Sequence, residues 1–124
     1  MARVLALTAD LLFGSRIQGD LTAAGNEVEL IGDEVRLRAR LGETDKPMAD
    51  ALVVDLTDAE LDGARTVEIL TGEGELHLVR TLGFYSHIDV QARERAEHAG
   101  FDLVVPRSRM AREGSQLVER LVSG

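Results

Sequence analysis

Short apolar runs alternate along the chain with longer segments in which apolar residues recur at helical spacing. Runs of this length, rich in aliphatic residues, are typical of strands buried on both faces of a sheet. The second run alternates polar and apolar residues, which favours a strand nearer a sheet edge. The pattern predicts five strands, at residues 4–7, 27–31, 52–54, 76–84 and 103–105.

The segments between these runs predict helices. Residues 11–24 place Phe13, Ile17 and Leu21 on one face and end before Gly25, which suits a residue just past a helix. Gly14 and Gly19 weaken this helix, each by about 1 kcal/mol relative to Ala, and we interpret Gly14 as permitting close packing. Further helices are predicted up to residue 70, where Leu61, Val67 and Leu70 share a face, at 90–99, and in the last segment around Leu117, Val118 and Leu121.

Residues 33–41 allow two interpretations. Their alternating pattern suits a strand that joins its neighbour through a turn at Gly32 and Asp33. Alternatively, Asp33 caps a helix in which Leu37 and Leu41 lie one turn apart. We favour the helix.

Strands that alternate with helices predict a parallel sheet covered on both faces, because right-handed crossovers place helices there. We therefore expect an α/β, flavodoxin-like fold, a three-layer sandwich around five parallel strands, with residues 1–124 forming a single domain. In this architecture, ligands bind beyond the carboxyl ends of the strands. Asp55 follows the third strand, and we expect its carboxylate to be solvated at that edge.

Chemically capable residues follow four of the predicted strands. Two carboxylates, hydroxyl groups, an imidazole and a guanidinium at one edge suit a phosphoryl group or a hydrated divalent cation. These residues are Asp10, Asp55, Tyr85, Ser86, His87, Arg107 and Ser108.

Several of these residues also have ordinary structural explanations. Asp10 suits the N-cap of the first helix, and Asp55 suits the start of a polar turn. Ser86 and Asp89 have the spacing of a capping pair for the fourth helix, which would place His87 in its first turn.

Composition narrows the choice of partners. The net charge of −8 disfavours nonspecific binding to nucleic acid or to an anionic membrane. No apolar run approaches the roughly 20 residues of a membrane span, and the N-terminal residues lack the pattern of a signal peptide, so we expect a cytoplasmic protein. There is no cysteine, and neither a G-x-G-x-x-G motif nor a P-loop follows any strand, which disfavours an enzyme.

Over nearly its whole length the chain resembles the receiver domains of two-component response regulators. In that family a phosphoacceptor aspartate ends the third strand and a glycine closes the following loop. Asp55 and Gly63 have this separation, and Ala99-Gly100 before the fifth strand also fits. The resemblance implies a CheY-like fold, with Asp55 as phosphoacceptor and Mg²⁺ held by Asp10 and Asp55.

The departures from the family concern the groups that surround the phosphoryl group. Receivers carry two adjacent acids after the first strand, whereas this chain has Thr8-Ala9-Asp10. Tyr85 falls where the family has Thr or Ser, and Arg107 falls where it has Lys. The one lysine of the chain, Lys46, lies in a distant loop. Arginine keeps the charge but presents a planar fork, so this exchange is not conservative.

These departures weaken the neutralisation of negative charge around a transferred phosphoryl group. We therefore favour an atypical, pseudo-receiver signalling domain without ordinary phosphorylation. It would act through a partner protein or self-association, using the surface of the fourth helix, fifth strand and fifth helix. The alternative is an authentic receiver phosphorylated on Asp55 by a histidine kinase with Mg²⁺. A second alternative is a flavodoxin-like ligand-binding protein or enzyme that uses the same rim for a nucleotide or a phosphorylated metabolite. The candidates for binding an anion at this rim are Ser86, His87, Arg107 and Ser108.

Overall fold

A computed structural model describes residues 1–124. Its centre is one sheet of five parallel strands in the order β2-β1-β3-β4-β5, which confirms the predicted α/β, flavodoxin-like fold. The strands are β1 (Arg3–Leu7), β2 (Glu27–Ile31), β3 (Ala51–Asp55), β4 (Arg80–Tyr85) and β5 (Leu103–Pro106).

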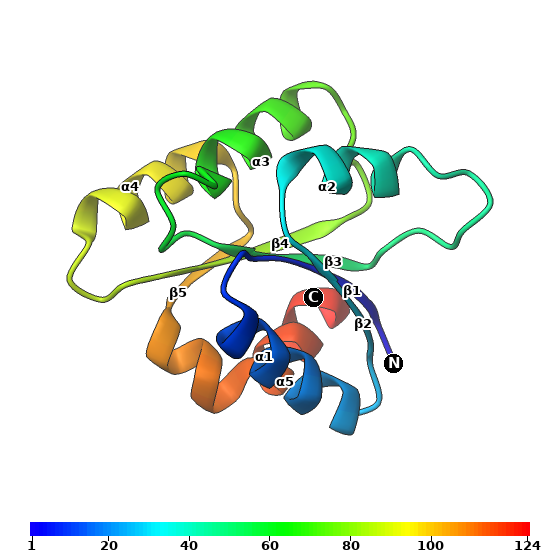
Figure 1. Cartoon of the computed structure of the whole chain (residues 1–124), viewed down its shortest axis with the longest axis horizontal. Coiled ribbons are helices and arrows are strands. Elements are labelled where there is room, and N and C mark those ends of the chain that lie inside the picture. Colours follow the sequence, from blue (N-terminus) through cyan, green and yellow to red (C-terminus); the bar gives the residue numbers. More distant parts are fainter.

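A helix follows each strand, and together the helices cover both faces of the sheet (Figure 1). The first and last helices lie on one face, and the middle three lie on the other. They are α1 (Leu11–Ala23), α2 (Glu34–Leu41), α3 (Gly63–Gly72), α4 (Val90–Ala99) and α5 (Arg107–Ser123). None of them combines the length and the apolar character that a membrane crossing requires.

The central strands separate two apolar cores. On β3, Ala51 and Val53 pack among residues of α1 and α5, while Leu52 and Val54 pack among residues of α2 and α3. Successive side chains of a strand point to opposite faces, so every apolar residue of β3 is buried. This double burial is the physical reason for the uninterrupted apolar run in the sequence.

Aspartates begin the first four helices. The side chains of Asp10, Asp33, Asp62 and Asp89 each accept a hydrogen bond from a backbone N–H in the first turn of α1, α2, α3 and α4. Such caps satisfy donors that the helix itself leaves unpaired. The cap at Asp33 confirms the helix over the segment that could also have been a strand. The left-handed φ of +94° at Gly25 confirms the predicted end of α1.

Two predicted elements were wrong in their bounds. The fourth strand begins at Arg80, whereas the prediction began it at residue 76. Leu76 and Val79 lie in the preceding turn, where both are buried in the core beside α2 and α3. Leu61 precedes α3 and packs against that same core from a loop. At these positions the apolar residues therefore predicted burial correctly, but they did not predict whether the backbone forms a strand, a helix or a turn.

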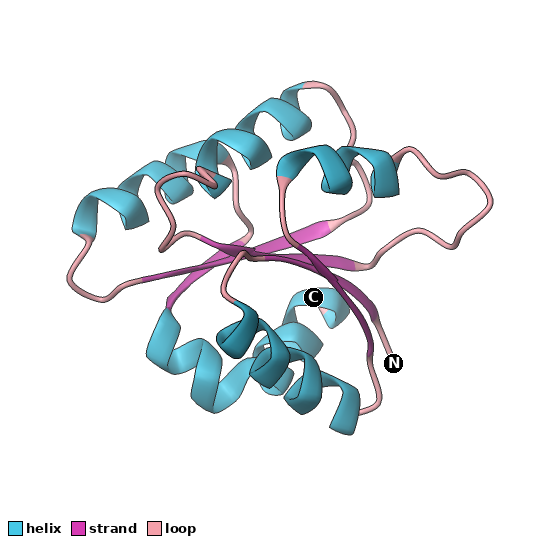
Figure 2. Cartoon of the chain, in the orientation of Figure 1, coloured by secondary structure: helices cyan, strands magenta, loops and turns pink.

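Strand register brings the carboxyl ends of the central strands together. Leu7 of β1 pairs with Val54 of β3, and Asp55 pairs with Phe84 of β4. The loops that follow β3 and β4, and the junction of β5 with α5, lie on the left of Figure 2, whereas the long loop before β3 lies on the right. The candidate residues thus share one edge of the sheet.

Candidate functional site

Asp55 is buried at the end of β3, with an exposed fraction of 2%. Its Oδ2 accepts a hydrogen bond of 2.8 Å from the Thr8 hydroxyl. Its Oδ1 accepts one of 2.8 Å from the backbone N–H of Thr57 and one of 2.6 Å from the Thr57 hydroxyl. The expectation of a solvated carboxylate was wrong, because these donors replace water around Asp55.

Thr8 also links this cluster to the start of α1. The backbone N–H of Asp10 donates to the Thr8 hydroxyl oxygen at 3.1 Å, while that hydroxyl donates to Asp55. Sequence reasoning did not assign Thr8 and Thr57 to the site. The signal that could have identified Thr8 is its position, because it follows Leu7 of β1, which pairs with Val54, the residue before Asp55.

Asp10 caps α1, as predicted, and its carboxylate makes no hydrogen bond with Asp55, Thr8 or Thr57. Its Oδ1 accepts a hydrogen bond of 3.0 Å from the Phe13 N–H, and its Oδ2 pairs with Arg107 Nη2 at 3.3 Å. The Arg107 guanidinium also lies over the Phe13 ring, 4.0 Å from its centroid. The structure therefore brings Asp10 and Arg107 together, and neither side chain hydrogen-bonds to Asp55.

Ser86, His87, Arg107 and Ser108 line one hollow between α1 and α5. The interpretation of Ser86 as a helix cap was wrong, because Asp89 is the N-cap of α4. Ser86 and His87 lie in the turn before it, where the Asp89 N–H donates to the Ser86 carbonyl at 2.8 Å. This turn directs both residues toward α5.

Tyr85 is buried on the other face of the sheet, toward α4. The Arg93 guanidinium lies beside Glu97 and Tyr85, and both raise the pKa of Arg93, Glu97 the more strongly. Tyr85 therefore contacts α4 and does not take the place of a hydroxyl beside Asp55.

A second hollow at this edge lies between α3 and α4. It is lined by Thr57, Asp62, Asp89 and Arg95, among others, and an ion pair of 3.0 Å joins Arg95 to Asp62 across it. Asp55 lines neither this hollow nor the one between α1 and α5. The buried carboxylate is thus separated from both.

The acids at this edge do not fit a Mg²⁺ site. Magnesium requires oxygen ligands in octahedral geometry, usually including one or two free carboxylates. Both carboxylates that the resemblance implies are already engaged, Asp55 by hydroxyl and amide donors and Asp10 by Arg107 and its helix. No group of three or more His, Asp and Glu side chains is close enough to hold a metal ion.

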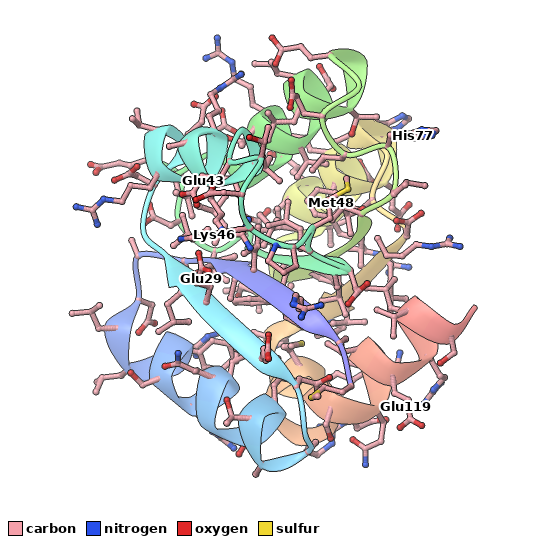
Figure 3. All side chains as sticks on the ribbon, turned by 90° about the vertical axis from the view of Figure 1, so that its right-hand side faces the viewer. Glu29, Glu43, Lys46, Met48, His77 and Glu119 are labelled. Carbon is pink, nitrogen blue, oxygen red and sulfur yellow. The ribbon has the colours of Figure 1, made fainter.

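Lys46 lies at the opposite edge of the sheet, in the loop before β3 (Figure 3). Its ammonium group pairs with Glu43 at 3.0 Å, and this carboxylate holds the pKa of Lys46 above its ordinary value. The one lysine of the chain therefore does not contribute charge near Asp55.

No protein-family model matches the chain. No curated protein matches it either. Solved structures with a similar course of the chain include the signal receiver domain of a signal transduction histidine kinase from Syntrophus aciditrophicus. Its TM-score is 0.86 at 18% identity, and the match covers 100% of this chain and 92% of that chain.

Two further structures of the same kind match over almost their whole length. The chemotaxis response regulator CheY4 of Vibrio cholerae has a TM-score of 0.80 at 17% identity, covering 98% of each chain. The HemR receiver domain from Leptospira biflexa has a TM-score of 0.79 at 21% identity, covering 100% of this chain and 96% of that chain. At these identities the likeness shows the fold alone, and the chain has the CheY-like fold of response-regulator receiver domains.

Proposed function

We propose that this chain is a receiver-like signalling domain that acts through protein contacts, without ordinary Mg²⁺-dependent phosphorylation of Asp55. The observation that carries the proposal is the state of the Asp55 carboxylate. It is 2% exposed, and both of its oxygens accept hydrogen bonds from Thr8 or Thr57. A nucleophilic oxygen must instead be free to meet a phosphoryl group in line.

The surrounding charges support the same proposal. Phosphoryl transfer to a carboxylate needs cations that neutralise the developing charge on the equatorial oxygens. Arg107 is the candidate for this role, but its guanidinium is held by Asp10 and the Phe13 ring. The acids at this edge do not fit the metal ion that would share the task.

Exposed apolar side chains near the same edge support a protein partner or a second copy as the output. Ile88 and Val90, at the start of α4, are 79% and 60% exposed. Leu11 and Leu12, at the start of α1, are also exposed. Apolar side chains gathered at one edge of a monomer are a common mark of protein contact.

One observation favours an authentic phosphoacceptor as the second candidate. Asp55 ends β3, and Gly63 begins α3 so close to that strand that an added Cβ would lie 2.4 Å from Val54 Cγ1. This is the aspartate-to-glycine arrangement on which the resemblance to receivers depends. A histidine kinase would then be the phosphoryl donor.

Incubation with acetyl phosphate and Mg²⁺ separates the two candidates. We expect the intact mass of the protein to stay unchanged, and beryllofluoride with Mg²⁺ to leave the amide NMR signals around Asp55 in place. An established receiver domain in the same buffer is the positive control, and the Asp55→Asn variant is the matched negative control. A phosphoryl adduct on the natural chain that is absent from Asp55→Asn would refute the proposal.

A further inference from the structure

We infer that the hollow between α1 and α5 binds a small organic molecule carrying a phosphate monoester. The inference goes beyond the proposed function and does not depend on the chemistry of Asp55, which does not line this hollow. It is carried by the charge of the hollow, by the hydrogen-bond donors that converge on it and by its apolar wall.

The charge of the hollow is opposite to that of the whole chain. Arg16, Arg107 and Arg112 line it, and no Asp or Glu does, although the chain carries a net charge of −8. Arg16 forms no ion pair within 4.0 Å. Arg112 Nη2 pairs with Glu113 at 3.5 Å. Arg107 pairs with Asp10, so an anion that enters this hollow meets one unpaired cation, Arg16, and two guanidinium groups that each already have one acidic partner.

Arg107 is held in place before any ligand arrives. The Phe13 ring supports one face of its guanidinium at 4.0 Å, and Asp10 accepts from Nη2. The guanidinium has five N–H donors in a rigid fork, so donors remain for a second anion. A fork that is already ordered loses little conformational entropy on binding, and its planar geometry suits a phosphate.

Two hydroxyls complete the polar side of the hollow. Ser86 approaches from the turn after β4, and Ser108 approaches from the start of α5. Neither hydroxyl forms a hydrogen bond within the chain, so both can serve a bound phosphate. Guanidinium and hydroxyl donors around one space are the usual means of holding this group.

The size and apolar wall indicate more than an inorganic ion. The hollow measures about 720 Å³, which lies in the range of small-molecule sites. Leu12, Phe13 and Ala111 are the apolar residues that line the hollow, and Leu12 is 88% exposed. An organic group on the phosphate would bury these apolar residues, whereas inorganic phosphate would leave them exposed to water.

Titration of the whole isotope-labelled chain with phenyl phosphate at pH 7.5 tests the inference. We expect saturable shifts of the Ser86, His87 and Ser108 amide signals, and tighter binding than for inorganic phosphate or uncharged benzyl alcohol. The Arg16→Gln/Arg112→Gln variant should bind phenyl phosphate at least about tenfold more weakly, because it lacks two charged donors. The Arg36→Gln variant, which changes an exposed arginine on α2, is the matched control and should bind like the natural chain.

Absence of saturable shifts at these amides would overturn the inference, as would equal binding by the natural chain and the Arg16→Gln/Arg112→Gln variant. Equal affinity for inorganic phosphate and phenyl phosphate would overturn the inference that the ligand carries an organic group. The measurement is separable from the test of the proposed function, because phenyl phosphate is not an activated phosphoryl donor. If phenyl phosphate does not bind, the acetyl phosphate experiment still tests whether Asp55 is phosphorylated.

Discussion

Among the 22 acidic residues of the chain, Asp55 alone is buried. Removing a carboxylate from water costs several kcal/mol unless other donors replace the water. Here two threonine hydroxyls and one backbone N–H replace it. The same hydrogen bonds that make the burial tolerable also occupy three of the roughly four acceptor positions of the carboxylate, leaving Oδ2 with one of them.

Thr8→Val tests this balance at a single residue. Valine has nearly the shape of threonine but no hydroxyl, so Oδ2 of Asp55 would lose its donor while packing is kept. Leaving a buried acceptor unpaired should lower the free energy of unfolding by about 1–3 kcal/mol, measured by urea denaturation. Thr44→Val, in the exposed loop before β3, is the matched control, with an expected change within about 0.5 kcal/mol. Equal effects of the two substitutions would contradict this account of Asp55.

At the scale of elements, the two glycines inside α1 differ in their surroundings. A Cβ added at Gly19 would meet nothing within 4 Å, whereas one added at Gly14 would lie 3.0 Å from Thr8 Cγ2. Gly14 therefore allows α1 to approach the end of β1, as its position near the helix start suggested. This close approach places the helix against the residue that binds Asp55.

Alanine substitutions at the two positions should have different effects. Gly19→Ala should raise the free energy of unfolding by about 0.5–1 kcal/mol, because alanine is the better helix former. Gly14→Ala should lose this gain or reverse it, since Thr8 must shift to accommodate the methyl group. Thermal and urea unfolding of both variants provide the comparison. A Gly14→Ala variant as stable as Gly19→Ala would show that the contact with Thr8 is unimportant.

Elements with both a cap and a periodic pattern were predicted well, and α2 is the best example. Asp33 supplied a local signal that the structure confirms as a cap. Residues 76–79 offered only apolar content, and that property does not distinguish a buried turn from a strand. The start of β4 therefore could not be found without knowing where the parallel partner β3 begins, since Ala51 pairs with Arg80.

At the scale of the whole molecule, both apolar cores share strands β1 and β3. Leu82 and Phe84 of β4 belong to the core with α1 and α5, while Leu5 and Leu7 of β1 belong to the other. Loss of the sheet would expose both cores together, so neither can unfold without the other. α4 is attached less firmly, because Ala96 and Ala99 are its buried residues.

Urea unfolding followed by two probes tests this cooperativity. Tyr85 is the one tyrosine, and the chain has no tryptophan, so intrinsic fluorescence reports the contact between β4 and α4. We expect the same midpoint from Tyr85 fluorescence and from far-UV circular dichroism, as for a two-state domain. A Tyr85 transition at clearly lower urea would show instead that α4 separates from an intact sheet.

The sequence by itself determined the order and type of the elements and the edge at which Asp10, Asp55, Ser86 and Arg107 emerge. Period and caps are local properties, so they can be read along the chain. Tertiary structure decided which of these side chains meet. Strand register placed Thr8 against Asp55, and the packing of α1 beside α5 turned Arg107 toward Asp10 and Phe13. Such contacts join residues far apart in sequence, and they depend on burial and register that no local pattern contains.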